Sequence, residues 1–217
     1  MPANVTRWWW IRHAPVTTHG GRIYGQEDYP ADLSDKDSFA VLAALLPAEP
    51  VWVTSHLRRT RETADAILAV GGNRNGAGSP PARLIEPDIA EQHVGAWHGL
   101  TNDELNALRG VAAHAFDLWP ASERPPQGES FLDVIARVGL AVAKLNIEHR
   151  GRDIVAVAHA GSIRAALAIA LGVEAERVLS FAIDNCSLTR IDHIEDAGRS
   201  AWRVVSVNRP AKSHSPL

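Results

Sequence analysis

The pattern of hydrophobic and polar positions divides the chain into short apolar runs and longer periodic segments. Short apolar runs are typical of buried strands, and three of them occur: in Trp8–Ile11, in Val51–Val53 and, after its first residue, in Asp153–Ala158. Two later segments, Ser180–His193 and Ala201–Asn208, are also predicted as strands, with a polar turn between them. A turn of that kind predicts an antiparallel hairpin.

Helical periodicity appears between these strands. Ser34, followed by Asp35 and Asp37, predicts a helix start, and Pro47 ends that helix. Thr101 and Glu104 have the spacing of a capping box. Apolar positions repeat at helical spacing in three further segments: His56–Val70, Glu129–His149 and Ser162–Leu171, the last closed by Gly172. The remaining segments are predicted to be irregular, apart from a short strand at Leu84–Ile85: a flexible insertion at Gly71–Pro81, loops at Pro87–Leu100 and Trp119–Gly128, and a loose tail at Arg209–Leu217.

Alternating strands and helices predict an α/β fold. We expect a three-layer α/β/α sandwich whose central sheet is mostly parallel, with an antiparallel edge formed by the C-terminal hairpin. A chain of 217 residues fits one domain, 1–217, and is long enough to bury a full core.

Composition narrows the possible partners and compartment. A net charge of −3 argues against a broad nucleic-acid surface, and no apolar run is long enough to span a membrane. The N-terminus lacks the pattern of a secretory signal, and Cys186, the single cysteine, allows neither an internal disulfide nor a thiolate metal cluster. We therefore expect a cytoplasmic protein that binds neither nucleic acid nor membranes. The sequence leaves the oligomeric state open.

Polar residues that can bind an anion follow each of the three central strands. Arg12 and His13 end the first, Thr54–Ser55 with Arg59 just beyond end the second, and His159 ends the third. The carboxyl ends of parallel strands share one edge of a sheet, so these side chains should meet. Arginine can grip phosphate oxygens in pairs, and this set therefore indicates a phosphate site.

A neutral imidazole in such a site can attack phosphorus. We expect His13 to be the nucleophile and the intermediate to be a phosphohistidine that water hydrolyses. Arg12, Arg59 and His159 would hold the phosphoryl group without a metal or other cofactor. Glu91 is the candidate for protonating the leaving oxygen, because like charge on a bound phosphate favours the protonated carboxyl.

Four segments in order resemble the histidine phosphatase superfamily, which includes the cofactor-dependent phosphoglycerate mutases. The segments are IRHA, SHLRRTRETA, EQHVGAWHGL and VAHAGSIR. The resemblance implies that Arg12 and Arg59 bind phosphate, His13 is the nucleophile, Glu91 the proton donor and His159 the second histidine. It runs from about Arg7 to Asn208 and includes PPQGESF and NCSLTRI. The segments GGRIYGQEDYP and PPQGES are most similar to the α-ribazole phosphatase-like branch, which implies a small-molecule phosphomonoester substrate.

The sequence also departs from that family. Ala14 stands where glycine is usual, and its methyl group could crowd the phosphate; Pro15 stands where the mutases carry glutamate. These two residues keep open the alternative of an idle phosphate-binding domain. A phosphoglycerate mutase, and a metal hydrolase that uses Glu91 with His93 and His98, are two further alternatives. The histidines could also be structural, and Arg58 is expected to be a surface residue.

Loop residues are candidates for the pocket that receives the leaving group. Trp97 and Trp119 lie in loops, and Thr17, His19 and Tyr24 follow the first strand closely. Absence of the long insertions found in the mutases favours hydrolysis over phosphoryl transfer to a second hydroxyl.

Overall fold

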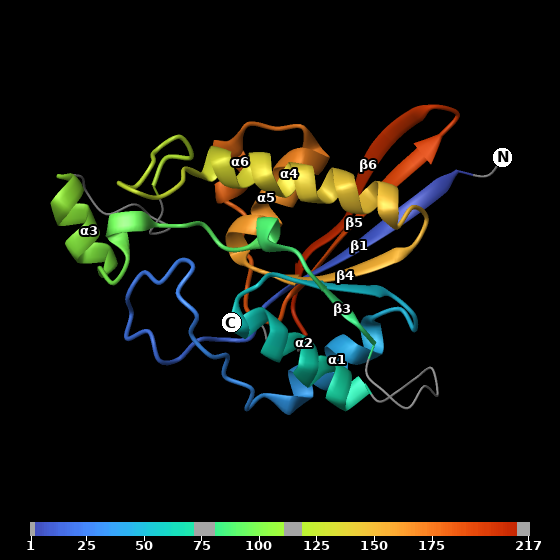
Figure 1. Cartoon of the computed structure of the whole chain (residues 1–217), viewed down its shortest axis with the longest axis horizontal. Coiled ribbons are helices and arrows are strands. Elements are labelled where there is room, and N and C mark those ends of the chain that lie inside the picture. Colours follow the sequence, from blue (N-terminus) through green and yellow to red (C-terminus); the bar gives the residue numbers. More distant parts are fainter. Residues whose placement is uncertain (1–2, 72–80, 111–118, 212–217) are drawn as a thin grey trace, which may run out of the picture.

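A computed structural model describes residues 3–71, 81–110 and 119–211. These residues contain one six-stranded sheet in the order β3-β2-β4-β1-β5-β6 (Figure 1). The first four strands of that order pair in parallel, and β5 and β6 continue the sheet antiparallel. The strands are β1 (Asn4–Arg12), β2 (Val51–Thr54), β3 (Arg83–Ile85), β4 (Asp153–Ala158), β5 (Leu188–Asp196) and β6 (Arg199–Arg209).

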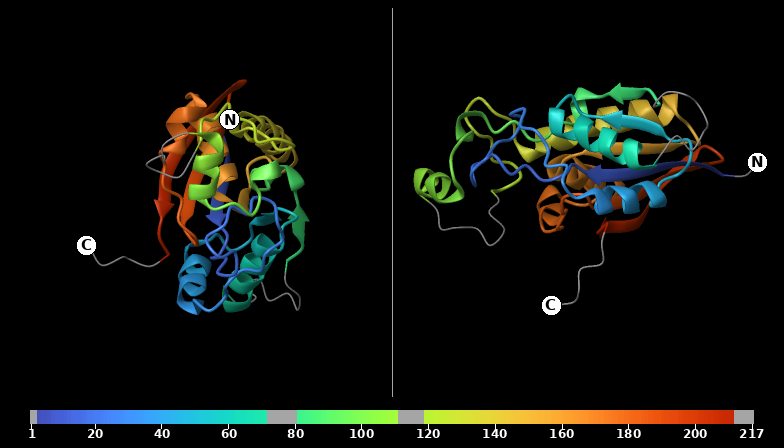
Figure 2. Two further views of the ribbon diagram at one scale, coloured as in Figure 1. Left: turned by 90° about the vertical axis from the view of Figure 1, so that its left-hand side faces the viewer. Right: turned by 90° about the horizontal axis from the view of Figure 1, so that it is seen from below.

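Helices cover both faces of this sheet, so the expected three-layer sandwich with its antiparallel edge is confirmed (Figures 1 and 2). On one face lie α4 (Phe131–Glu148), α5 (Ala160–Leu171) and α6 (Ala175–Leu179); on the other lie α1 (Lys36–Leu45) and α2 (Arg58–Gly71). The short helices η1 (Pro87–Ile89) and η2 (Gly95–Trp97) and helix α3 (Asn102–Arg109) follow β3. Helix α3 stands beyond the sheet, at the end opposite the N-terminus.

The tryptophans of β1 show how the sequence fixes the layers. Side chains alternate across a strand, and Trp8 and Trp10 stack at 5.0 Å in the core beneath α4 and α5. Ile11 points the other way, into the core beneath α1 and α2. The indole nitrogen of Trp8 donates to Asn146 Oδ1 at 2.8 Å, which satisfies the one polar group of this buried ring.

Several helix starts differ from the sequence prediction: α2 begins at Arg58 and not at His56, and α4 begins at Phe131 and not at Glu129. Asp35, and not Ser34, caps α1, because its carboxylate accepts the amide of Ser38 at 3.2 Å. Helix α5 begins at Ala160, two residues before the predicted Ser162, with His159 as its N-cap. The capping box at Thr101 is confirmed, as is the end of α5 at Gly172.

The prediction of a strand over the whole of Ser180–His193 was wrong at its beginning. Strand β5 starts only at Leu188. Cys186 has a φ of +56°, in the left-handed region, which a strand does not tolerate, and its amide donates to Arg12 O at 3.0 Å. Its thiol is buried, and burial raises its pKa to about 11, in keeping with a small hydrophobic residue.

The predictions for the insertion, the tail and the number of domains are not tested by the structure. Most of the predicted insertion at Gly71–Pro81 and of the tail lies outside the described residues. Among the helices of the described residues, none combines the length and the apolar character that crossing a membrane requires. The assignment of 1–217 to one domain stays a prediction.

Candidate active site

The polar ends of β1, β2 and β4 meet at one edge of the sheet, as expected from parallel pairing. Arg12 lies opposite Ala158 in the register, and the amide of His13 donates to Ala158 O at 3.0 Å. The rings of His13 and His159 therefore lie together, with centroids 5.1 Å apart, and both side chains are buried. The two histidine signatures, 146 positions apart in the chain, form one structural unit.

The hydrogen bond of His13 fixes which ring nitrogen carries the proton. Nδ1 lies 2.7 Å from Ala14 O. A carbonyl oxygen can only accept, so Nδ1 is the protonated nitrogen and Nε2 keeps its lone pair. Burial, followed by the charges of Arg59 and Arg12, holds the pKa of His13 well below its ordinary value. The ring is therefore neutral at pH 7, which is the form a nucleophile needs.

His159 has the opposite arrangement of free and bonded nitrogens. Its Nε2 lies 2.8 Å from Ser55 Oγ, a residue that follows β2. Its Nδ1 is buried and has no hydrogen-bond partner among the described residues. Burial and the charge of Arg59 lower the pKa of this ring well below its ordinary value too. A buried nitrogen without a partner is costly, and a phosphoryl oxygen would satisfy it.

Two arginines supply positive charge beside the histidines. Arg12 Nη1 donates to Ile183 O at 2.6 Å. Arg59, fully buried in the first turn of α2, donates to Gly25 O at 2.7 Å and to Glu27 O at 2.6 Å. The buried Nε of each arginine has no partner within the described part of the chain. Both guanidinium groups are thus held by backbone carbonyls, with donors left for an anion.

Arg58, the neighbouring candidate, behaves as expected for a surface residue. Its side chain is half exposed and pairs with Glu62 at 2.5 Å, one turn along α2. It does not line the pocket described below.

The alanine in place of the usual glycine belongs to the hydrophobic core. Ala14 is fully buried among residues of the core between the sheet and helices α1 and α2. Its amide donates to Thr63 Oγ1 at 2.9 Å, which holds the turn after His13. The methyl group therefore points into the core, and Ala14 is not among the residues that line the pocket.

Glu91 reaches the site from the irregular segment between η1 and η2. Its Oε1 accepts the amide of Gly161 at 3.2 Å and that of Gln92 at 3.0 Å. A Cβ atom at position 161 would lie 2.3 Å from this oxygen, so only glycine allows the approach. The glycine of the second histidine signature thus makes room for the candidate proton donor.

Arg137 on α4 holds the segment that carries Glu91. Its terminal nitrogens donate to Asp88 O at 2.6 Å, to Ala90 O at 2.9 Å and to Glu91 O at 3.0 Å. Glu129 pairs with the same guanidinium at 2.8 and 2.9 Å. Arg137 was not predicted from the sequence, although an arginine beside the apolar face of a long helix is a signal that such a contact exists.

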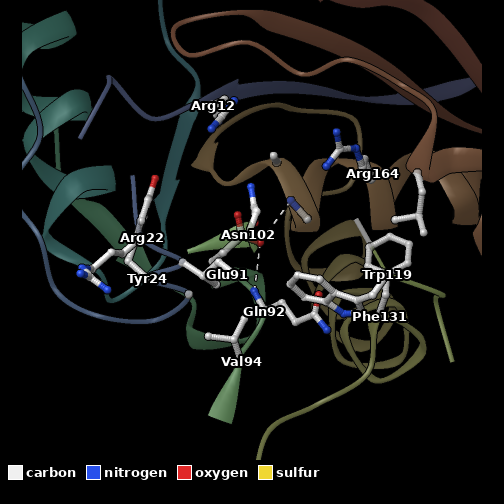
Figure 3. Close-up of a pocket in the computed structure, with 15 residues that line it drawn as sticks. Arg12, Arg22, Tyr24, Glu91, Gln92, Val94, Asn102, Trp119, Phe131 and Arg164 are labelled. Carbon is white, nitrogen blue, oxygen red and sulfur yellow. Dashed lines mark hydrogen bonds between the residues drawn. The ribbon is translucent and has the colours of Figure 1, made fainter. Parts of the chain in front are cut away.

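A pocket of about 360 Å³ opens in front of these groups (Figure 3). Arg12 and Glu91 line it directly, whereas His13, His159 and Arg59 are not among its lining residues. Its wall combines polar, aromatic and aliphatic side chains with small residues of α5: Arg22, Ile23, Tyr24, Gly25, Gln92, Val94, Asn102, Trp119, Phe131, Ala160, Gly161, Arg164 and Leu179.

The structure separates the candidates for the leaving-group pocket. Tyr24 and Trp119 line it. Trp97 packs edge-on against Trp119 with centroids 5.1 Å apart, and His19 packs on Tyr24 at 4.9 Å, so these two rings lie behind the wall. Thr17 is not among the lining residues.

Three further residues line the pocket and were not predicted from the sequence: Arg22, Asn102 and Arg164.

The two histidines considered as metal ligands interact with other protein groups. His98 Nε2 faces Glu27 at 3.6 Å, and His93 Nδ1 accepts the amide of Gly95 at 3.3 Å. Across residues 3–71, 81–110 and 119–211, no three histidine, cysteine or acidic side chains are grouped so that they could hold a metal ion.

Comparison with known proteins agrees with this geometry. The family described as "Histidine phosphatase superfamily (branch 1)" matches residues 8–209. The chain belongs to this superfamily. That confirms the resemblance drawn from the four sequence segments, which all lie inside the matched region.

Relatives within the superfamily carry different activities in their names. Glucosyl-3-phosphoglycerate phosphatase of Mycolicibacterium vanbaalenii is 33% identical over 175 residues, 75% of this chain and 73% of that protein. Other curated relatives, of Serratia proteamaculans and Escherichia fergusonii, are named "probable phosphoglycerate mutase". Some mycobacterial relatives are much longer; they are 32% identical over 123 residues, and the match spans only 33% of their length.

Solved structures share the fold. A mycobacterial glucosyl-3-phosphoglycerate phosphatase superposes with a TM-score of 0.78 and 27% identity, over 96% of this chain and all of that one. A candidate alpha-ribazole-5'-P phosphatase from Escherichia coli gives a TM-score of 0.73 over 94% of this chain and 98% of that one. At 22% identity this second likeness shows the fold alone.

Proposed function

We propose that the protein hydrolyses phosphomonoesters through a phosphohistidine on His13. The observation that carries this proposal is the hydrogen bond from His13 Nδ1 to Ala14 O, because it leaves Nε2 unprotonated in a ring whose pKa burial keeps low. Two guanidinium groups beside that ring favour an anionic substrate.

The reaction has two steps. In the first, Nε2 of His13 attacks phosphorus, the bond from phosphorus to the ester oxygen breaks, and Glu91 gives its proton to the departing oxygen. In the second, water attacks the phosphohistidine and gives a proton to the Glu91 carboxylate. The N–P bond breaks, inorganic phosphate leaves, and both side chains return to their starting forms.

The surrounding groups stabilise the transferring phosphoryl group. Arg12 and Arg59 have donors left for its oxygens, and the unpartnered Nδ1 of His159 adds a further polar contact. Phosphoryl transfer depends mainly on positioning and charge neutralisation, and these three side chains supply both.

A phosphoglycerate mutase is the second candidate, and the relatives with that name support it. A mutase would retain the phosphohistidine and pass the group to a second hydroxyl. Its activity would depend on a bisphosphate primer, which a hydrolase does not need.

The test is phosphate release from a panel of phosphomonoesters in the presence of EDTA, with wild type beside His13→Ala. We expect release by wild type alone, and acid-labile phosphate on wild-type protein quenched during turnover. Release by the His13→Ala variant would refute the mechanism. Loss of activity in EDTA would indicate a metal hydrolase. Binding of esters without release would indicate an idle domain, unless a bisphosphate-primed mutase assay is positive.

A further inference from the structure

Arg164 is a cation of the pocket that the proposed chemistry does not use. It lies on α5, one turn beyond Gly161, so both residues face the pocket from the same side of the helix (Figure 3). Its Nε donates to Phe181 O at 2.9 Å, which fixes the guanidinium in place. The side chain is held at the pocket wall while its terminal nitrogens remain available.

Four other partly buried arginines form ion pairs with carboxylates, whereas Arg12 and Arg59, at the proposed phosphate site, are bound by backbone carbonyls. Arg109 pairs with Glu123 at 2.5 Å and Arg137 with Glu129 at 2.8 Å. Arg22, the other cation at the pocket mouth, donates to Gly99 O and lies 3.5 Å from Glu104. No carboxylate forms an ion pair with Arg164 among the described residues. Burial lowers the pKa of Arg164, the negative charge of Glu91 raises it and the positive charge of Arg12 lowers it, and burial is the largest of these effects.

Glu91 is the one acidic side chain among the residues that line the pocket, and it forms no ion pair with Arg164 within the described part of the chain. Trp119 and Phe131 line the pocket together with Arg164 (Figure 3). Leu179 is a further lining residue. Glu91 is the acidic group whose charge affects the pKa of Arg164. Its Oε1 accepts hydrogen bonds from the amides of Gly161 and Gln92. A desolvated cation beside apolar side chains is stabilised by an anion with a hydrophobic neighbouring group.

We propose that Arg164 binds a carboxylate carried by the alcohol part of the substrate, whose apolar part packs on Trp119, Phe131 and Leu179. This inference rests on the proposed hydrolysis, because it assigns the leaving group of that reaction. Arg12 and Arg59 hold the phosphoryl group, and Arg164 holds the far end of the molecule. The preferred substrates are therefore phosphomonoesters with two anionic ends.

Matched ester pairs test this assignment. Each pair consists of an ester with a carboxylate and the corresponding carboxamide, which has nearly the same shape and no charge. The pairs are 3-carboxyphenyl and 3-carbamoylphenyl phosphate, the two 4-substituted analogues, and 3-phosphonooxypropanoate with its amide. The quantity measured is the ratio of kcat/KM for the charged and neutral members. This ratio does not depend on the fraction of folded enzyme.

The variants are Arg164→Gln, Arg164→Lys and, as a control of equal charge change, Arg177→Gln on the exposed face of α6. In wild type we expect a ratio of about 10 to 100 in at least one pair, the range for a hydrogen bond to a charged group. It should fall to about 1 in Arg164→Gln, keep an intermediate value in Arg164→Lys and be unchanged in Arg177→Gln.

Two results would overturn the assignment: a wild-type ratio near 1 in all three pairs, or a ratio in Arg164→Gln equal to that of wild type. The second would mean that Arg164 acts on Glu91 and not on the substrate, since it would then affect both members of a pair equally. If wild type releases phosphate from no ester, the proposed hydrolysis fails instead. Calorimetric dissociation constants for the same pairs then decide the role of Arg164 by the same ratios.

Discussion

Oε1 of Glu91 lies 3.2 Å from the amide nitrogen of Gly161, two residues beyond His159. The contact joins the irregular segment before η2 to the first turn of α5, and a Cβ atom at position 161 would come within 2.3 Å of the oxygen. The candidate proton donor and the second histidine are thereby set at a fixed distance by one backbone amide.

Gly161→Ala should displace Glu91 and leave the histidines in place. We expect kcat/KM for alkyl phosphates to fall at least tenfold, because a displaced acid cannot protonate the leaving oxygen. Steady-state assays measure this. Gly139→Ala is the control, since its Cβ would meet Ile169 at an ordinary 3.6 Å. Equal activity of Gly161→Ala and wild type would show that the contact is not needed.

Glu91→Gln should make the rate depend strongly on the leaving group. An alkyl alcohol needs protonation as it departs, whereas nitrophenolate leaves without it. The expected loss is therefore about 10² to 10⁴-fold for alkyl phosphates and much smaller for 4-nitrophenyl phosphate. The measurement is the slope of log kcat/KM against the pKa of the leaving alcohol. An unchanged slope would argue against Glu91 as the acid.

Arg137→Lys should act through the position of Glu91. Lysine keeps the charge but cannot donate to three carbonyls and a carboxylate at once. We expect a lower kcat for alkyl phosphates with a smaller change in KM, and a leaving-group slope that moves toward that of Glu91→Gln. Arg124→Lys, at an exposed ion pair with Asp133, is the control. A slope identical to wild type would mean that Arg137 only stabilises the fold.

Stability should decrease in acid because of the buried histidines. His13 and His159 are neutral in the folded protein, with pKa values well below 6.5, whereas in the unfolded chain they bind protons as the pH falls through 6.5. Proton uptake by the unfolded state lowers the free energy of unfolding, by at most about 1.4 kcal/mol per pH unit for each histidine.

Urea denaturation between pH 7.5 and 5 measures this slope. His13→Asn should reduce it, and His56→Asn, which changes an exposed ring, should not. A slope that is the same in His13→Asn and wild type would show that His13 does not titrate differently in the two states.

The sequence predicted the parts of the site that lie at ends of regular elements. Arg12, His13 and His159 follow apolar strands directly, and the rule for parallel strands is enough to bring them together. The same rule places Arg59 at this edge of the sheet, because it lies in the first turn of the helix that follows β2. Glu91 lies in an irregular segment that no periodicity could have placed, and it was named from the chemistry that the reaction needs and from the family segments.

Contacts that depend on long side chains and irregular backbone could not be predicted. Helical spacing assigns Arg137 and Arg164 to a face, but it does not show which carbonyls a guanidinium reaches. The late start of β5 depends on a left-handed φ at Cys186, a conformation that its own residue type does not signal. Trp119 was predicted as a residue of the leaving-group pocket because it lies in a loop, and no periodicity shows where its ring packs.

The order of the sheet has a consequence for synthesis on the ribosome. Strand β1 is made first, yet its two neighbours are β4 and β5, so it waits for about 150 further residues before either edge is covered. Until then three consecutive tryptophans remain on an unpaired strand, which is a site for association between nascent chains. His13 and His159 can therefore come together only when β4 has been made and joins β1 in the sheet.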